Sequence, residues 1–396
     1  MVNILFLSRH FPPIVSGGAR RPYLLAKGLQ AEGAHVRVIA PAMPEDVDGA
    51  IVPHPQVAPL EASQARNSRY KGQNSILRNW IRANLFLPDP DIRWALRAVA
   101  GGSFEDFNPD WLMTTSPPES VHVAGYLIAR KLRAGWIADF RDNWLIDPLV
   151  PQRQRPLRRA VEKRIAKAIL SKADVITAPS KRMLDEIADY APGVRRLLLP
   201  QPGVLDEAAP IVRQSTSKDG DDPIIVLHTG SFSLSHGTRS IEPTLEVFAE
   251  ARRRHPRFVL HLIGRLTEQE HVLATAAPGV EPLGVVTMTE TWKAQRAADI
   301  LLLAAAPHTD IVPGKISEYE ASSRPIVVVG GSEWAQAING KGGPLARLLS
   351  LADSDARSTT LGESNAWSAQ EVARLLLDFI AASADSRGHA GTGARL

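Results

Sequence analysis

The sequence predicts an α/β protein made of two similar halves, each built around a parallel β-sheet. Short apolar runs alternate with helical patterns along the chain, which is typical of strand–helix–strand units. The alternation stops at residues 204–222, a stretch rich in Asp and Ser, and then starts again. We therefore expect a first domain over residues 1–203, a linker over 204–222 and a second domain over 223–366.

The elements of the first half follow from its apolar runs and from one glycine. Gly33 is expected to end the first helix, because glycine readily adopts the left-handed conformation that closes helices. Residues 41–91 show little periodicity and predict a long surface insertion. The predicted elements are the strands Val2–Ser8, His35–Ala40, Trp111–Thr114, Trp136–Phe140, Asp174–Ala178 and Arg196–Leu199, and the helix Arg20–Gly33.

The second half repeats this pattern and is followed by one more helix. Residues 367–382 predict a C-terminal helix that packs back on the first domain, and residues 383–396 predict a disordered tail. The other predicted elements are the strands Ile224–His228, Phe258–Ile263, Val280–Leu283, Ile300–Ala304 and Pro325–Val329, and the helices Arg239–Arg254, Thr267–Ala277 and Thr289–Ala298.

Composition is that of a globular, cytoplasmic protein. The chain has 396 residues, 44% of them hydrophobic, which is enough to bury sizeable cores. It has no cysteine, which excludes disulfides, thiolate nucleophiles and thiolate metal ligands. The first residues read as a strand and not as a signal peptide, and no apolar run is long enough to span a bilayer. The net charge of +4 suits anionic ligands without implying nucleic acid.

One predicted helix concentrates positive charge. Residues 153–172 combine an apolar stripe at helical spacing with many basic residues and a single acid, Glu162. Two interpretations remain open: the helix rests on the anionic inner face of a membrane, or its basic face is simply solvated. The basic residues are Arg153, Arg155, Arg158, Arg159, Lys163, Arg164, Lys167 and Lys172.

Two carboxylates, Asp310 and Glu318, bracket a turn that opens a helix between two buried strands. Gly314 and Lys315 fall at the start of that helix, where free backbone N–H groups suit an anion. Glu318, one turn further, would face hydroxyl groups beside that anion. Sugar hydroxyls next to a phosphate describe a nucleotide sugar, and an ordinary solvated helix cap is the alternative.

A glycine pair follows the first strand. Gly17 and Gly18 can let a ligand approach backbone amides, and Arg20 and Arg21 add positive charge. The third glycine of the dinucleotide fingerprint is absent, which disfavours an NAD enzyme. A plain tight turn is the alternative interpretation of the pair.

Together these segments resemble the family 4 glycosyltransferases, retaining enzymes whose two Rossmann-like domains face each other across a cleft, the architecture called GT-B. The resemblance covers nearly the whole chain and depends on the order and spacing of several motifs. These motifs are Phe11–Gly18, Thr115–Pro118, Asp139–Trp144, Ala173–Ser180, Thr229–Ser231, Arg239–Phe248, Leu262–Gly264, Ala298–Ile300 and Gly314–Tyr319.

The resemblance implies a donor site in the second domain. Arg239, expected at the start of a helix, matches the family's lysine that grips the donor diphosphate, and Glu318 matches its ribose-binding glutamate. Ser231 replaces the family's partner arginine, so Lys315 or Arg265 is expected to share the phosphate contact. The implied donor-binding residues are Gly230, Ser231, Arg239, Arg265, Val286, Asp310, Gly314, Lys315 and Glu318.

The resemblance also implies residues that act on the reacting groups. Asp310 is a departure, because the family usually has a glutamate there. Arg141 and Asp142 end a strand opposite the transferred sugar, with a buried ion pair as the competing interpretation. The implied catalytic residues are Arg239, Lys315, Asp310, Asp142 and Arg141, and the implied acceptor-side residues are Gly17, Gly18, Arg20 and Arg21.

Two further motifs are assigned no chemistry. His122 follows a strand but is expected to pack in a core. Asp89-Pro-Asp91 lies in the irregular insertion and not after a strand, so it is not expected to bind a metal.

The function implied by the resemblance is sugar transfer, with retention of configuration, from a nucleotide-diphosphate sugar to a glycan, lipid-linked or small-molecule acceptor. No metal or other cofactor is expected, because fixed cations would stabilise the departing diphosphate. Two alternatives stay open: a nucleotide-sugar epimerase or hydrolase on the same architecture, and a non-catalytic nucleotide-sugar-binding protein.

Overall fold

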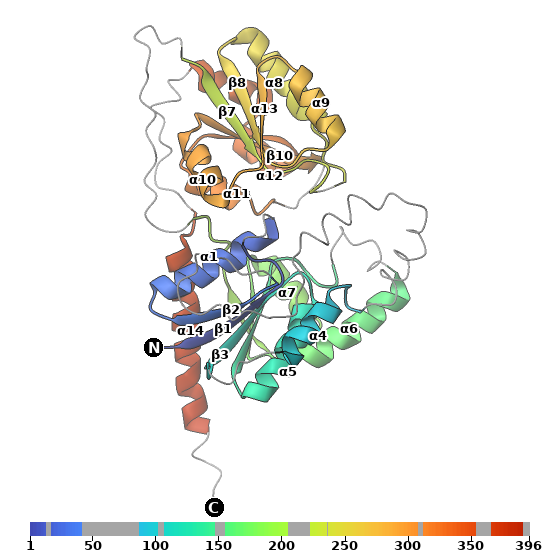
Figure 1. The fold of residues 1–396 in the computed structure, drawn as a ribbon, viewed down its shortest axis with the longest axis vertical. Coiled ribbons are helices and arrows are strands. Elements are labelled where there is room, and N and C mark those ends of the chain that lie inside the picture. The colour runs from blue at the N-terminus through green and yellow to red at the C-terminus, as the bar shows by residue number, and fades with distance from the viewer. Residues whose placement is uncertain are drawn as a thin grey trace, which may run out of the picture. The chain divides into compact units, whose positions relative to one another are not determined.

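The computed structural model describes residues 1–12, 17–41, 87–101, 107–146, 155–204, 222–235, 237–307, 312–353 and 366–390, with side chains described up to residue 382. The chain divides into two compact units, one formed by Met1–Leu205 with Ser368–Leu396 and the other by Asp206–Trp367. Each unit contains one parallel sheet with helices on both faces, so the predicted α/β fold with two Rossmann-like sheets is confirmed (Figure 1). None of the helices described is long and apolar enough to cross a membrane.

The sheet of unit 1 has six strands in the order β2-β1-β3-β4-β5-β6. The chain winds outward from β1 in one direction and from β3 in the other, so the edge between these two strands is the point where the topology reverses. Ligands of open α/β sheets bind at such points, beyond the carboxyl ends of the strands. The strands are β1 (Asn3–Ser8), β2 (His35–Ile39), β3 (Trp111–Ser116), β4 (Gly135–Phe140), β5 (Val175–Ala178) and β6 (Arg195–Leu198).

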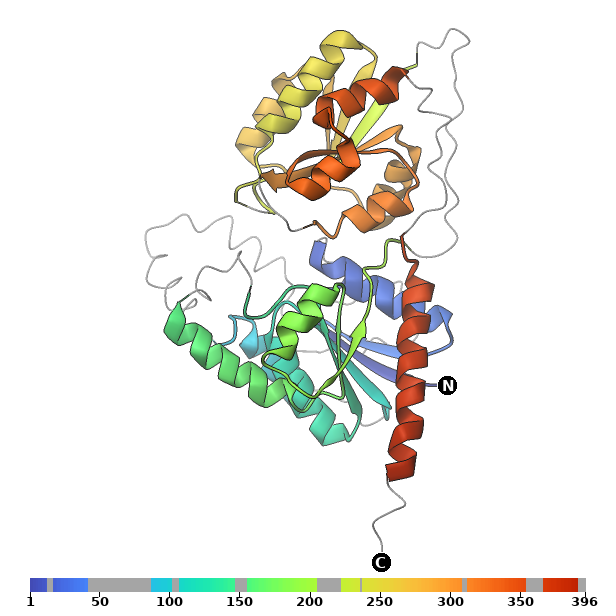
Figure 2. The same cartoon turned by 180° about the vertical axis from the view of Figure 1, so that it is seen from behind.

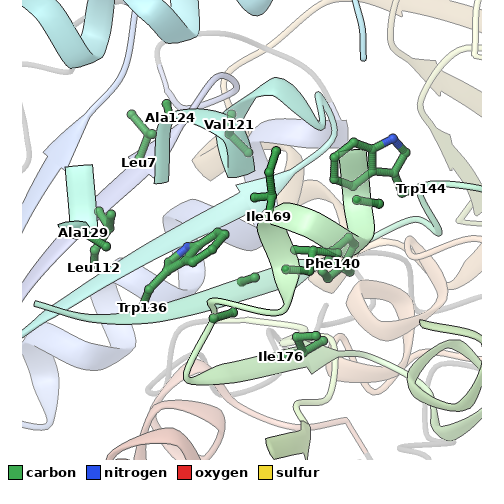
Figure 3. Packing of buried hydrophobic residues seen from close by; sticks show 14 of the residues in the cluster. Leu7, Leu112, Val121, Ala124, Ala129, Trp136, Phe140, Trp144, Ile169 and Ile176 are labelled. Carbon is green, nitrogen blue, oxygen red and sulfur yellow. The ribbon is translucent and has the colours of Figure 1, made fainter. Parts of the chain in front are cut away.

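Alternate side chains of these strands build the two cores of unit 1. One face packs against α1 and the C-terminal helix α14, and the opposite face packs against four helices between the strands. Figure 3 shows the second core, where Trp136, Phe140 and Trp144 lie among aliphatic side chains. The helices are α1 (Gly17–Ala31), α4 (Ile92–Ala100), α5 (Ser120–Leu132), α6 (Pro156–Leu170), α7 (Lys181–Ala188) and α14 (Ala369–Ala390).

Helix α14 lies beside α1, as both ribbon views show (Figures 1 and 2). The two helices meet at Gly28, where an added Cβ would overlap the backbone oxygen of Ala369. Val372 and Leu376 of α14 complete the core on that face of the sheet. The helix extends to Ala390, past the predicted boundary at residue 382, and the disorder expected for residues 383–396 stays a prediction.

The sheet of unit 2 has five strands in the order β11-β10-β7-β8-β9. Its topology reverses between β7 and β10: the helix that follows β7 packs on one face of the sheet, and the helix that follows β10 packs on the other. The strands are β7 (Ile224–Thr229), β8 (Phe258–Ile263), β9 (Val280–Gly284), β10 (Ile300–Pro307) and β11 (Ile326–Gly331).

Six helices cover the two faces of this sheet. Those on the first face are α8 (Glu242–Arg254), α9 (Glu268–Ala276) and α13 (Gly343–Asp353), and those on the second are α10 (Met288–Ala297), α11 (Ile316–Ala321) and α12 (Glu333–Asn339). Helix α8 begins at Glu242, with Pro243 in its first turn, where proline is well tolerated. The helix predicted from Arg239 therefore starts three residues later, and Arg239 lies in the loop ahead of it.

The expected packing role of His122 agrees with its surroundings. The side chain is fully buried between Phe140 and Trp144, and its Nδ1 lies 2.9 Å from the hydroxyl of Thr114. Burial lowers the pKa of His122 to about 3, so the imidazole is neutral in the folded protein.

Replacing Gly28 by alanine is expected to destabilise unit 1 by about 1–3 kcal/mol, because the new methyl group has to displace α14. Gly17→Ala is the matched control in the same helix, since no atom lies within 4 Å of its added Cβ. Thermal unfolding of the two variants measures the difference. Equal midpoints would show that α14 does not need a glycine beneath it.

The buried neutral His122 predicts that stability falls on acidification. Its pKa is about 3 in the folded state and 6.5 when unfolded, so the unfolded chain binds the extra proton between these pH values. The neutral His122 contributes fully to the free energy of unfolding above pH 6.5, and about 2 kcal/mol of this contribution is lost by pH 5. His122→Asn, which can keep the bond to Thr114, should therefore lose less stability than the wild type between pH 7 and pH 5 in urea unfolding. An unchanged pH slope in the variant would contradict this.

Candidate functional site

The candidate site of unit 2 begins where β7 ends, at the reversal point of its sheet. Gly230 leaves the strand with φ of 125°, a conformation that favours glycine, and its N–H donates to the backbone oxygen of Ile263 over 2.7 Å. An added Cβ on Gly264 would overlap the backbone oxygen of Gly230. Lys315 lies across this turn, since its Cε would be 3.3 Å from a Cβ on Gly230. The two glycines therefore let the loops after β7 and β8 run close together under a lysine.

A network of buried polar groups surrounds Lys315. Its ammonium lies 3.3 Å from the hydroxyl of Thr229 and 3.6 Å from Oε2 of Glu318. Gln295 donates from Nε2 to the same two oxygens, each over 3.0 Å. The Tyr319 hydroxyl accepts from the Thr229 N–H over 2.9 Å. The network joins the end of β7 to α10 and α11, which come from distant parts of the sequence.

The burial of this network differs from group to group. Glu318 is only 2% exposed, and Gln295 and Tyr319 are completely buried. The Lys315 side chain is 25% exposed, so the ammonium lies between the buried carboxylate and solvent. Gly314 is exposed at the start of α11, with no atom within 4 Å of an added Cβ. The structure therefore brings Gly230, Lys315 and Glu318 together, with Gly314 directly before Lys315, and their donor-binding roles stay predictions.

His228 connects this network to Arg239. Its Nδ1 lies 3.0 Å from the backbone oxygen of Leu302, which can only accept, so Nδ1 carries the proton. Its ring stacks on Phe232 at 4.4 Å. Burial, together with the positive charges of Lys315 and Arg239, lowers the pKa of His228 to about 3. Both cations are thus close enough to act on one imidazole, and that imidazole is neutral.

Arg239 is partly buried in its loop. Its Nε is buried and has no hydrogen-bond partner among the residues described, and burial lowers the pKa of the guanidinium. A buried N–H without an acceptor is costly, and an anion at this position would satisfy it. Arg239 therefore combines a positive charge with an Nε–H group that can donate to an anion beside the network.

The remaining donor-side candidates lie around this centre. Ser231 follows Gly230, and its carbonyl oxygen accepts from the Ser235 hydroxyl over 2.9 Å. Arg265 is exposed directly after β8, and Val286 is half-buried against the core on the α10 face. Asp310 lies outside the described residues. Sequence reasoning did not identify Glu270, which holds the same loop by accepting from the N–H and the hydroxyl of Ser233 over 2.9 and 2.7 Å.

In unit 1 a row of polar residues crosses the sheet near its carboxyl edge. Ser8, Thr115, Asp139 and Thr177 are in register on neighbouring strands, on the face that α1 covers. Arg21 of α1 is paired with Asp139 through two hydrogen bonds of 3.0 and 2.8 Å. The register of four parallel strands thus places one buried acid beneath a helix.

Arg21 is occupied by this structural role. Its side chain is 1% exposed, and it also donates to the backbone oxygens of Leu199 and Pro200 over 3.0 and 2.9 Å. We therefore correct its predicted place on the acceptor side. A guanidinium whose nitrogens all bond protein acceptors cannot also bind a ligand. Arg20, its neighbour, lies on the same helix at 8% exposure.

Arg141 holds the glycine turn of unit 1 in place. Its guanidinium donates to the backbone oxygens of Ser116 over 3.0 Å, Pro117 over 3.2 Å and Gly18. A Cβ on Gly18 would lie 2.8 Å from Nη1 of Arg141, so a larger residue here would require the guanidinium to shift. Arg141 thus joins the ends of β3 and β4 to α1 as a positioning residue, and its catalytic role stays a prediction. Asp142, next to it, is exposed.

His10 is a polar group near this turn that sequence reasoning missed. Its ring lies against Gly18, since Cγ would be 3.3 Å from a Cβ there. Its Nδ1 is buried and has no partner among the residues described. Burial, with the charges of Arg141 and Arg9, lowers its pKa to about 4. A histidine two residues beyond the first strand was the available signal, because strand ends of parallel sheets form sites.

The carboxylates of the Asp89-Pro-Asp91 motif have structural roles. Asp89 accepts from the N–H groups of Ser120 and Asp91 over 2.8 and 2.9 Å, and Asp91 pairs with Arg9. In the described part of the chain, no three His, Asp or Glu side chains are grouped so that they could hold a metal.

The fold is similar to those of several solved structures. The chain is similar to sucrose-phosphate synthase from Thermosynechococcus elongatus, with TM-score 0.61 and 15% identity over 98% of this chain and 100% of that one. It is also similar to Anabaena HepE in complex with UDP and glucose, with TM-score 0.54 and 13% identity over 96% and 100%. A putative UDP-N-acetylglucosamine 2-epimerase from Listeria monocytogenes has TM-score 0.52 and 15% identity over 97% of each chain. These likenesses show the GT-B fold.

Part of the first unit matches a known protein family. No curated protein matches the chain. Residues 16–202, which include the glycine turn, Arg141 and the polar residues Thr115, Asp139 and Thr177 of unit 1, match the model of the glycosyl transferase 4-like domain. Residues 16–202 are therefore similar to a glycosyl transferase 4-like domain, which agrees with the family 4 resemblance of the motifs in this half of the chain.

Proposed function

We propose that this protein is a retaining glycosyltransferase that moves a sugar from a nucleotide-diphosphate sugar to an acceptor. The observation that carries the proposal is the group of Lys315, Glu318 and Arg239 at the reversal point of the unit 2 sheet. It offers two cations for a diphosphate and one buried carboxylate for the hydroxyls of a ribose. The family match of unit 1 supports the same conclusion.

In the proposed reaction the cations stabilise the charge that builds on the departing diphosphate. Lys315 and Arg239 are already in place before the ligand arrives, and a preorganised cation stabilises a developing charge without reorganisation cost. His228, which is neutral between them, does not add a competing charge. An oxygen of the leaving phosphate takes the acceptor proton on the same face of the sugar, which retains the configuration. No metal is required in this scheme.

The acceptor is proposed to bind at the glycine turn of unit 1. Arg141 fixes the backbone of Gly18, and Arg20 supplies charge nearby. The neutral ring of His10 lies against the same turn and can accept a hydrogen bond from a hydroxyl group. A lipid-linked glycan and a small soluble alcohol both fit this chemistry.

A second candidate function is nucleotide-sugar epimerisation, which the similarity to a putative UDP-N-acetylglucosamine 2-epimerase favours. Incubation of the donor alone separates the two. Conversion of the nucleotide sugar without any acceptor would support the epimerase, whereas acceptor-dependent release of the nucleoside diphosphate supports the transferase.

Removing either cation is expected to lower sugar transfer about 100-fold or more. Thermal-shift screening of nucleotide sugars first identifies the donor, because a ligand of the folded state raises its unfolding midpoint. Transfer of the labelled sugar to lipid and aqueous extracts is then compared among the wild type, Arg239→Ala, Lys315→Ala and Arg253→Ala. Arg253 is the control, since its side chain is 74% exposed on α8. Near wild-type transfer by Arg239→Ala would rule out its assignment.

Helix α6 suggests where a lipid-linked acceptor would be met. Its one acid, Glu162, is buried and paired with Arg158, so the exposed face is uniformly basic. Leu157 is 80% exposed at the start of the helix. We propose that this face lies on anionic lipid, which attracts each basic residue by about 1 kcal/mol. The exposed basic residues are Arg155, Arg159, Lys163, Arg164, Lys167 and Lys172.

Flotation with liposomes tests the membrane proposal. The wild type should float with vesicles that contain anionic lipid and not with neutral vesicles, and added salt should release it. The triple variant Lys163→Glu/Arg164→Glu/Lys167→Glu should stay in the soluble fraction. Arg252→Glu/Arg253→Glu/Arg254→Glu on α8 makes the same charge change elsewhere and should float like the wild type. Flotation that is the same for all three proteins would refute a role for α6.

A further inference from the structure

Gln295 of α10 occupies an unusual place beside Glu318. Its side chain is completely buried, and Nε2 lies 3.0 Å from both the Thr229 hydroxyl and Oε2 of Glu318. The amide orientation is fixed chemically, because a carboxylate oxygen can only accept, so the nitrogen of the amide must face it. Both N–H groups of Gln295 are thereby used.

The hydrogen bonds around Thr229 then have only one consistent direction. Its hydroxyl accepts from Gln295 and from Lys315, which uses both lone pairs. Its own proton therefore goes to the Tyr319 hydroxyl, 3.2 Å away, which also accepts the Thr229 N–H. Tyr319 in turn donates to the backbone oxygen of Leu302 over 3.3 Å. This series of hydrogen bonds ends at the backbone oxygen of Leu302 in β10. The orientation of the Gln295 amide is therefore fixed by bonds that lead to the sheet backbone.

This arrangement has a cost that packing alone would not require. The Oε1 atom of Gln295 is buried and has no hydrogen-bond partner among the described residues. A methionine of similar length would fill the same space without an unpaired polar atom. The amide is therefore explained by what its nitrogen does for Glu318 and Thr229.

We infer that Gln295 is a positioning residue that holds the Glu318 carboxylate in the orientation that binds the ribose hydroxyls of the donor. This inference rests on the proposed function. Glu318 and Lys315 are one turn apart on the helix start, and their charged atoms are 3.6 Å from each other. The two bonds from Gln295 anchor Oε2 and Thr229 at fixed positions. Without them the carboxylate can turn toward the ammonium, and both groups are lost to the ligand.

Paired ribonucleotides and deoxynucleotides test this inference directly. Binding of UDP, GDP and ADP is measured by calorimetry, and the tightest binder is compared with its 2′-deoxy and 3′-deoxy forms. The wild type should prefer the ribose form about 10-fold or more, which is the effect of a hydrogen bond to a charged group. Gln295→Met should reduce that preference to less than about 3-fold, with a smaller loss of affinity for the deoxy forms. Glu318→Gln should have the same effect.

Two further proteins separate positioning from stability. Asn339→Leu removes another buried amide of unit 2, one that bonds the N–H and the oxygen of Val328 over 2.9 and 2.7 Å. It should lower the unfolding midpoint and leave the ribose preference unchanged. The double variant Gln295→Met/Glu318→Gln should show no greater loss of preference than Glu318→Gln alone, because both changes disable one unit.

The outcomes distinguish the inference from the function on which it rests. If no nucleoside diphosphate binds the wild type, the proposed donor site is wrong. If the wild type prefers ribose and Gln295→Met keeps the full preference, the donor site stands and the role of Gln295 is overturned. Equal loss of ribose preference in Asn339→Leu would also overturn it, since the effect would then follow stability alone.

Discussion

A carboxylate removed from water must be paired, and unit 2 depends on how it pairs Glu318. The acid is buried where the winding of the sheet reverses, and its partners Gln295 and Lys315 come from two helices on the same face. A buried charge left without partners would cost several kcal/mol. The pairing of Glu318 therefore requires the ends of β7, α10 and α11 to stay together. It also fixes the Glu318 carboxylate and the Lys315 ammonium at the edge of the sheet.

Unit 1 also buries a carboxylate, but there the ion pair leaves no donor for a ligand. Asp139 is completely buried, but Arg21 closes over it with two hydrogen bonds and spends its other donors on backbone oxygens. That pair is saturated and serves the fold. In unit 2 the Lys315 side chain is 25% exposed, and the buried Nε of Arg239 has no hydrogen-bond partner within the part of the chain that the structure describes. The Arg21–Asp139 pair stabilises the sheet edge of unit 1, whereas the partly exposed Lys315 and the Arg239 guanidinium supply the positive charge that the proposed diphosphate site requires.

Local sequence patterns predicted much of this. The Gly-Lys-Ile-Ser-Glu run placed Lys315 and Glu318 one turn apart at a helix start, which depends only on helical periodicity. The strands were found because buried parallel strands are continuous apolar runs. By contrast, Arg20 and Arg21 are adjacent in sequence, and only the packing of α1 on the sheet decides which of them meets Asp139. Gln295 and Thr229 are 66 positions apart, so their contact depends on strand order and could not be inferred from spacing. The position of His10 just after β1 was a signal in the sequence, but its neighbours Gly18 and Arg141 come from distant parts of the chain and could not be inferred from spacing.

The return of α14 to unit 1 affects how the protein is made. Val204 pairs with Ser368, and Ala369 donates to the Val204 oxygen over 2.9 Å, so unit 2 is inserted between two segments that lie side by side. Multidomain chains usually complete their N-terminal domain first during synthesis. Here all of unit 2 must be synthesised before Val372, Ala373, Leu376 and Ile380 can cover the first sheet. Until then α1 covers only part of that sheet face and the area beneath α14 stays exposed, while unit 2 is able to finish folding first.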